Sequence, residues 1–164
     1  MHEDLISHMG EALTGRPPDT DLNMGGLLAR LVDVAGTIRA AAAMLGRSPN
    51  TVSRWRRGVQ KPKIGEQAVR AALRRASLPP GFEKQVKNGS RKMVITGWFH
   101  VSGEKSRRRS LHVGDHIPAR KIANVVNAWL KGDDARANRL LWKSIDAHYT
   151  EGIDADEILG ISFR

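Results

Sequence analysis

Four polar side chains between positions 50 and 57 have the types and the spacing needed to read DNA bases. They are Asn50, Ser53, Arg54 and Arg57, at positions i, i+3, i+4 and i+7, so they share one face of a helix. An arginine can donate two hydrogen bonds to guanine O6 and N7, and an asparagine can pair with adenine N6 and N7. The stripe predicts contacts with base edges in the major groove, and the alternative for each side chain is a contact with phosphate only.

A first short helix is expected just before this stripe. Its apolar positions also follow helical spacing and are Ile38, Ala41, Ala42 and Leu45. The small side chain of Ala42 allows a second helix to cross at close range. Gly46 follows, and glycine is the residue that most readily adopts the left-handed conformation that ends a helix.

The second helix is predicted to begin immediately after the turn. Ser48 is a good N-cap and Pro49 suits the first helical position, where its missing N–H would be unpaired in any case. Val52 and Trp55 form a short apolar stripe opposite the polar one. This order of features predicts a helix-turn-helix with Pro49–Arg57 as the helix for the major groove, the alternative being an ordinary helical hairpin with a solvated basic face.

Other polar residues flank the predicted groove-facing stripe and suit contacts with phosphate. We also include the cap residue Ser48 among the DNA-binding candidates. The flanking candidates are Arg39, Arg47, Thr51, Lys61 and Lys63.

Composition limits the classes of protein to which the chain can belong. The 164 residues allow one medium domain or two small ones, and the formal net charge of +10 favours an anionic partner. The chain has no cysteine, which excludes disulfides and thiolate zinc sites. No apolar run is long enough to span a bilayer, and the N-terminus lacks the features of a secretory signal. We therefore expect a cytoplasmic, nucleoid-associated protein without membrane partners.

The basic residues are concentrated between Arg39 and Lys121, whereas both ends of the chain are rich in acids. A solvated basic face is the simplest interpretation of any one cluster. Because nearly all clusters lie in the middle of the chain, we expect a continuous DNA-facing surface.

The hydrophobic periodicity predicts an α+β protein with an all-helical N-terminal part and a small ββααβ domain. The predicted segments are an N-terminal helix and linker (1–20), the helix-turn-helix domain (21–78), a linker (79–90) and the α+β domain (91–164). In the last segment, the alternation of apolar and polar residues predicts strands at 93–101, 107–113 and 159–163, with two helices between the second and third strands.

The predicted hairpin of the second domain carries three consecutive arginines, Arg107, Arg108 and Arg109. A β-ribbon can enter a groove or follow the DNA backbone, so we expect a second DNA contact here. The alternative is an exposed basic edge that resists aggregation. The tryptophans Trp98, Trp129 and Trp142 are expected in the core of this domain, although Trp98 could instead stack on an unpaired base.

The residues that could support catalysis do not form a usable set. His100, His112 and His116 are close in sequence, but Gly114 argues against the helix on which the last two could bind a metal. Tyr149 has no surrounding catalytic residues. The sequence therefore predicts no enzymatic activity, no catalytic residue, no metal and no cofactor.

Several short motifs together resemble one family. The helix segment SPNTVSRW resembles the recognition helix of repressor-type helix-turn-helix proteins, although Arg47 stands where most members have an aliphatic residue. Over nearly the full chain, the layout resembles the terminal proteins of linear actinobacterial chromosomes and plasmids. The segments that carry this resemblance are TVSRW, QKPK, MVITG, RRRSLHV, VVNAWLKGDD, HYTEG and ILGISF.

The resemblance implies binding to telomeric DNA, with a telomere-associated protein and a DNA polymerase as partners. It also implies a hydroxyl to which the first nucleotide is joined. The family tends to have a threonine pair in the turn before the basic strand, and this chain has none there. Ser102 is the nearest match, with Ser106 and Thr96 as substitutes, and a hydrogen-bonding turn residue is the alternative role for Ser102.

These observations lead to one principal hypothesis and one alternative. The first is a sequence-specific double-stranded DNA-binding protein that binds replicon ends and supports their replication. The alternative is a transcriptional repressor of a plasmid, phage or integrative element, whose C-terminal domain pairs with a second copy of the chain. A DNA-modifying enzyme is a third class for which we find no site.

Overall fold

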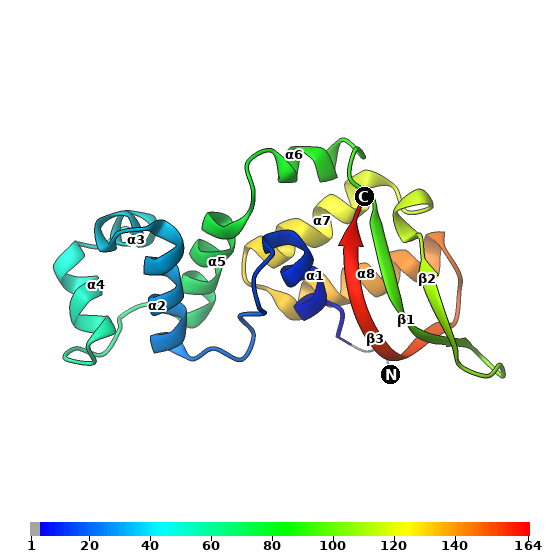
Figure 1. Cartoon of the computed structure of the whole chain (residues 1–164), viewed down its shortest axis with the longest axis horizontal. Coiled ribbons are helices and arrows are strands. Elements are labelled where there is room, and N and C mark those ends of the chain that lie inside the picture. The colour runs from blue at the N-terminus through cyan, green and yellow to red at the C-terminus, as the bar shows by residue number, and fades with distance from the viewer. Residues whose placement is uncertain (1–3) are drawn as a thin grey trace. The chain divides into compact units, whose positions relative to one another are not determined.

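The computed structural model describes residues 4–164, which separate into two compact units. Residues 19–78 together with 130–132 form the helix-turn-helix (HTH) unit. Residues 4–18, 79–129 and 133–164 form the sheet unit. The predicted α+β class and the N-terminal helix-turn-helix are confirmed (Figure 1). Within residues 4–164, no helix is long and apolar enough to cross a membrane.

Four helices make up most of the HTH unit. Side chains cap three of them at the N-terminus: Asn23 accepts from the Gly26 N–H at 2.9 Å, Thr37 from the Ala40 N–H at 3.1 Å, and Ser48 from the Thr51 N–H at 3.2 Å. The helices are α2 (Met24–Ala35), α3 (Ile38–Leu45), α4 (Pro49–Arg56) and α5 (Glu66–Ser77).

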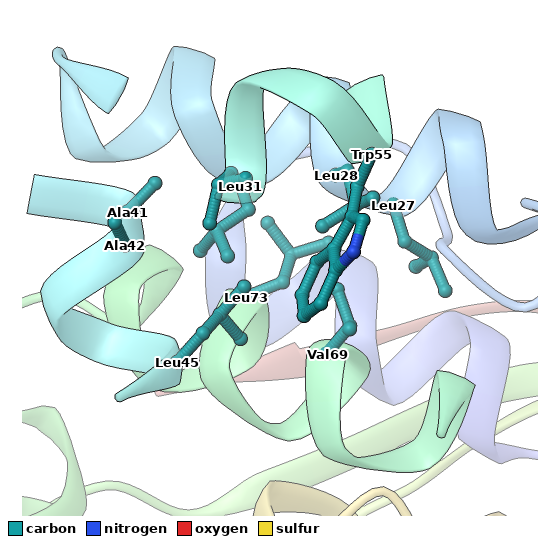
Figure 2. Close-up of a cluster of buried hydrophobic side chains, with 10 residues drawn as sticks. Leu27, Leu28, Leu31, Ala41, Ala42, Leu45, Trp55, Val69 and Leu73 are labelled. Atoms are coloured by element: carbon teal, nitrogen blue, oxygen red, sulfur yellow. The ribbon is translucent and has the colours of Figure 1, made fainter. Parts of the chain in front are cut away.

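One hydrophobic cluster holds these four helices together (Figure 2). Each helix contributes side chains to it, including Leu31 from α2, Leu45 from α3, Trp55 from α4 and Leu73 from α5. Ala41 and Ala42 are fully enclosed, which agrees with the close crossing expected where small side chains face a neighbouring helix.

The sheet unit contains a three-stranded antiparallel sheet with strand order β2-β1-β3. Its strands are β1 (Met93–Val101), β2 (Arg107–Leu111) and β3 (Ile153–Phe163). Its helices are α1 (Ile6–Thr14), α6 (Phe82–Lys87), α7 (Ala119–Leu130) and α8 (Asp134–His148), with a 3-10 turn at Val113–Asp115.

One face of the sheet is buried and the other is largely open. On β1, Met93, Ile95 and Phe99 are buried, whereas the alternate positions Thr96 and Trp98 are half-buried and exposed. Figure 1 shows α8 running behind the three strands, on one side of the sheet. The other strands add Leu111 of β2 and Ile153 and Ile158 of β3 to the core, and the helices supply most of its remaining apolar residues.

Glycine is required at one point in β1 because β3 approaches it closely. A Cβ on Gly97 would lie 2.4 Å from the backbone oxygen of Glu157. The pairing of β1 with β3 is irregular on both sides of this position, between Thr96 and Gly97 and between Trp98 and Phe99.

The structure differs from the sequence-based expectations in the sheet unit. The segment 79–90, interpreted as a linker, contains α6. The second strand ends at Leu111, and the third begins at Ile153 rather than at residue 159. Helix α1, interpreted as part of a separate N-terminal segment, belongs to the sheet unit and packs against β3.

The expectation for Trp98 was wrong. Its side chain is 40% exposed on the open face of the sheet, whereas Trp129 and Trp142 are buried as predicted. The sequence pattern could not distinguish the two faces, because apolar residues such as Val94 also occur at the positions that alternate with the core residues.

Candidate nucleic-acid interface

The turn between α3 and α4 depends on Gly46. Its φ of 64° lies in the left-handed region, and its N–H donates to the Ala43 carbonyl at 3.2 Å. The next N–H, that of Arg47, donates to the Ala42 carbonyl at 3.0 Å. These bonds end α3 and direct the chain into the second helix of the motif.

Ser48 caps the start of α4. Its Oγ accepts from the Thr51 N–H at 3.2 Å and pairs with the Thr51 hydroxyl at 2.8 Å. Pro49 occupies the first turn, where it removes no helical hydrogen bond. Local chemistry therefore sets the position at which the candidate recognition helix begins.

The inner face of α4 anchors the helix to the rest of the HTH unit. Val52 is fully buried and Trp55 is 4% exposed, and both belong to the hydrophobic cluster. Figure 2 shows Trp55 above Val69 of α5. The indole Nε1 of Trp55 has no hydrogen-bond partner within the described residues, so the residue contributes through packing.

The outer face of α4 presents the polar stripe to solvent. Asn50 and Arg54 are exposed and Ser53 is half-buried. The helix ends at Arg56, so Arg57 is its C-cap; the Arg57 side chain is exposed, with Nε 3.4 Å from the Ser53 carbonyl. All four candidate base-reading residues thus lie on the side of α4 opposite its anchors.

Arg56 is a further exposed arginine of α4 that the stripe did not include. It lies between Trp55 and Arg57, two residues from Arg54, and is therefore not one of the positions i, i+3, i+4 and i+7 that define the stripe from Asn50. The basic run Arg54, Arg56 and Arg57 is the sequence signal that points to it.

The predicted phosphate-binding residues lie around α4. Arg39, Lys61 and Lys63 are exposed. Arg47 is exposed as well, but its Nη1 lies 3.3 Å from the Gly46 carbonyl, so its guanidinium folds over the turn. In the loop after α4, Val59 is 71% exposed beside these basic residues.

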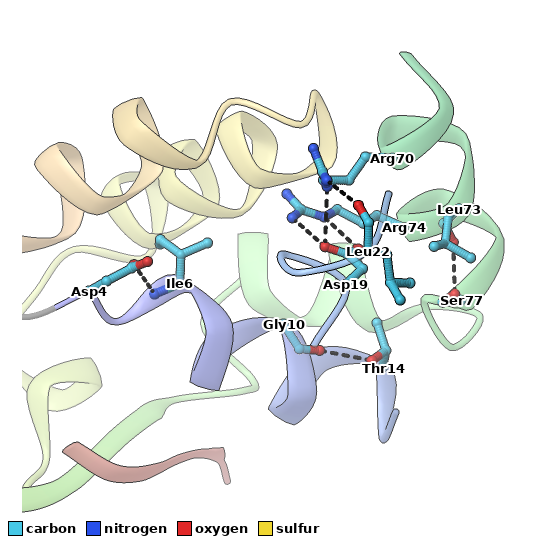
Figure 3. A network of polar contacts seen from close by, with 10 residues as sticks. All are labelled: Asp4, Ile6, Gly10, Thr14, Asp19, Leu22, Arg70, Leu73, Arg74 and Ser77. Atoms are coloured by element: carbon cyan, nitrogen blue, oxygen red, sulfur yellow. Dashed lines mark hydrogen bonds and ion pairs between the residues drawn. The ribbon is translucent and has the colours of Figure 1, made fainter. Parts of the chain in front are cut away.

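The expected continuous basic surface is interrupted at α5. Arg74 is 1% exposed, and its guanidinium donates from Nε and Nη2 to the two carboxylate oxygens of Asp19 at 3.0 and 2.7 Å (Figure 3). Arg70 Nε lies 3.5 Å from the same carboxylate. Arg74 is therefore a buried structural residue and does not belong to a DNA-facing surface.

The three arginines of β2 do not share one face of the sheet. Arg108 pairs with Trp98 of β1, whereas Arg107 pairs with Phe99 and Arg109 with Gly97. Directly paired residues point to the same face, so Arg108 lies on the open face and the other two point to the opposite face. Arg109 also lies 3.6 Å from Glu104.

The candidate hydroxyls of the hairpin have different surroundings. Ser102 is exposed in the turn after β1. The Ser106 hydroxyl forms a hydrogen bond with the Asp156 carboxylate, and this bond lowers the pKa of Asp156. His100, whose Nδ1 lies 3.2 Å from Asp156 Oδ2, lowers that pKa further. Thr96 Oγ1 lies 3.1 Å from Ser110 Oγ. Of the three, Ser106 is the one beside a carboxylate.

Comparison with known proteins identifies the HTH unit. Residues 27–63 match the homeodomain-like domain family, and the match extends from α2 through the loop after α4. This segment is a helix-turn-helix DNA-binding domain, which implies double-stranded DNA as the partner. No curated protein and no solved structure matches the chain significantly. The resemblance to terminal proteins gains no support from these comparisons.

Proposed function

We propose that the chain binds a specific sequence of double-stranded DNA by placing α4 in the major groove. The observation that carries this proposal is the division of α4 into a buried side, with Val52 and Trp55, and an exposed polar side that includes Arg54. A rigidly anchored helix can hold its outer side chains in a defined register against the base edges.

In this proposal, the side chains around α4 have two kinds of role. Asn50, Arg54 and Arg57 contact base edges, where a bidentate pair contributes about 1–3 kcal/mol of discrimination between bases. Lys61 and Lys63 contact phosphates, together with Arg39. These contacts increase affinity for every sequence and make binding strongly dependent on salt.

Selection from a pool of random duplexes with the purified full chain tests this proposal directly. We expect enrichment of one short core sequence and protection of its major-groove edges from chemical modification. Absence of enrichment, or equal affinity for the selected and a scrambled duplex, would contradict sequence-specific recognition.

Two finer roles are compatible with such binding. The motif resemblance supports a function at replicon ends, and a gel-shift comparison of replicon-end DNA with promoter duplexes distinguishes it from the repressor role. A repressor that binds as a dimer favours palindromes with half-sites about one helical turn apart. A protein specific for replicon ends favours end sequences without that symmetry.

The hairpin hydroxyls provide a separate test of the replicon-end role. Incubation with a DNA polymerase and labelled deoxynucleotide, followed by phosphoamino-acid analysis, detects nucleotide joined to serine or threonine. The hydrogen bond between Ser106 and Asp156 favours Ser106 over Ser102 as the acceptor, since it holds the Ser106 hydroxyl in a defined position. If the label is retained in S106A but lost in S102A, Ser102 is the acceptor instead of Ser106. If the wild-type protein takes up no label, neither residue is an acceptor.

A further inference from the structure

The open face of the sheet has an unusual row of side chains across its centre. In register, Arg108 of β2, Trp98 of β1 and Glu157 of β3 lie side by side. Arg108 and Glu157 are exposed, and Trp98 is 40% exposed. Neighbouring strands are roughly 4.8 Å apart, so the two charged residues are separated by about 10 Å, with the indole between them.

The two charges in this row have no ionic partner among the residues that the structure describes. Neither Arg108 nor Glu157 forms an ion pair with another residue of the range 4–164. The acidic side of the face extends to Asp156, whereas Arg108 supplies the charge on the basic side. Leu159, an extra residue where the β1–β3 register shifts, is 43% exposed near the acidic side.

A row that is basic at one end, aromatic in the middle and acidic at the other is complementary to itself. Rotation by 180° about an axis parallel to β1, in the plane between two stacked sheets, places β2 of one copy over β3 of the other. Arg108 then faces Glu157 of the second copy, Trp98 faces its own counterpart, and Glu157 faces the second Arg108. This is the arrangement of an isologous interface.

We propose that two copies of the chain pair through this face, with their β1 strands parallel. The pairing removes Trp98 from water and gives both free charges a partner. An axis perpendicular to the strands would instead place Arg108 over Arg108 and Glu157 over Glu157. Charge therefore selects one of the two stacked orientations.

The area of the face places the contact among small interfaces. Three strands at roughly 4.8 Å and five residues at about 3.4 Å cover approximately 240 Å² per copy, or about 500 Å² in total. Stable complexes bury about 1,200 Å² or more, so this contact corresponds to a weak, concentration-dependent dimer.

The charges favour a second copy of the chain over single-stranded nucleic acid as the occupant. An exposed aromatic on a sheet can stack on a base, but the backbone phosphates then need basic neighbours. On this face Arg108 is accompanied by two carboxylates, Glu157 and Asp156, the latter paired with His100 at 3.2 Å, and Arg107 and Arg109 point to the other side. The face therefore disfavours a polyanion. It favours a partner that presents the same row of basic, aromatic and acidic residues in the reverse order.

Sedimentation equilibrium of the full chain, with two charge reversals, tests the pairing. The wild-type protein is expected to show a concentration-dependent dimer at about 0.1–0.5 mM. R108E and E157R should each weaken dimerisation at least about tenfold, because each juxtaposes like charges. An equimolar mixture of R108E and E157R should associate as a heterodimer, since both of its charge pairs are then opposite in sign.

The double variant R108E/E157R and a control complete the experiment. The double variant should dimerise like the wild type, because both interfacial pairs are restored with reversed polarity. R120E changes an exposed arginine of α7 and should leave dimerisation unchanged. Circular dichroism confirms that each variant is folded.

Three results would overturn the proposal. They are a wild-type protein that remains monomeric at about 0.5 mM, dimerisation that neither reversal weakens, and a mixture of the two single variants that does not associate. Binding of a single-stranded oligonucleotide that W98A abolishes would assign the face to a different occupant.

Discussion

Arg74 and Asp19 form a bidentate ion pair that ties α5 to the start of the HTH unit. The guanidinium donates to both carboxylate oxygens, at 3.0 and 2.7 Å, and Arg74 is 1% exposed. The two residues are 55 positions apart in the sequence. The Asp19 carboxylate is itself largely buried and compensates the charge of Arg74, while Arg70 lies 3.5 Å from it as a second cation.

Removal of the carboxylate should therefore destabilise the HTH unit. We expect D19A to lower the free energy of unfolding by about 3 kcal/mol, because it leaves a buried guanidinium without its anionic partner. Urea denaturation measures this change. D21A removes an exposed carboxylate two residues away and is the matched control; equal effects of the two variants would show that the ion pair has no specific role.

The N-cap of α4 links local stability to DNA binding. Ser48 Oγ accepts from the Thr51 N–H at 3.2 Å. We expect S48A to lower the free energy of unfolding by about 1 kcal/mol, since the first turn of α4 loses a hydrogen-bond acceptor. S48T retains the hydroxyl and should lose less. Denaturation curves for the two variants provide the comparison, and an identical loss for both would exclude the cap as the cause.

Arg54 should contribute to sequence discrimination. R54A is expected to lower affinity for the selected duplex by about 1–3 kcal/mol and to have much less effect on a scrambled duplex. Fluorescence anisotropy on both duplexes measures the difference. R75A removes an exposed arginine of α5 and controls for the loss of one positive charge. Equal losses on both duplexes would assign Arg54 to phosphate.

Lys61 should contribute to affinity without discrimination. We expect K61A to weaken binding to all duplexes by a similar factor and to reduce the slope of log K against log salt by about 0.9, the value for one lost phosphate contact. Salt titrations of the wild type and K61A test this prediction. An unchanged slope would place Lys61 outside the interface.

The helix-turn-helix could be predicted from sequence because its determinants are local. Gly46, Ser48 and Pro49 specify the turn and the start of α4, and Val52 and Trp55 specify its buried side. Each acts within one or two helical turns, so spacing alone was sufficient. The exposed side of α4 then follows from helical geometry.

Features that depend on distant contacts were not predictable in the same way. Arg74 appears in a basic cluster, and only its approach to Asp19 removes it from the surface. Trp98 lies on a strand with apolar residues on both faces, so its exposure depends on which side the helices cover. Helix α6 has only Phe82 and Val86 as buried anchors, too few to produce a periodic signal.

Gly97 offers a test of the sheet geometry on which the proposed pairing depends. A Cβ at this position would lie 2.4 Å from the Glu157 carbonyl oxygen and 3.2 Å from the Ile158 Cα. The nearest atoms belong to the backbone of β3, so they cannot move aside without separation of the two strands. We expect G97A to lower the free energy of unfolding by about 1–3 kcal/mol, the usual range for overpacking.

Gly160 is the matched control because it lies on β3, opposite Thr96, and a Cβ there would meet no atom within 4 Å. G160A should therefore have little effect on stability, measured by thermal or urea denaturation. Because Glu157 is the residue displaced by a methyl group at position 97, G97A should also weaken self-association of the chain, whereas G160A need not. A G97A protein as stable as the wild type would show that β1 and β3 are not in the close register on which the row of Arg108, Trp98 and Glu157 depends.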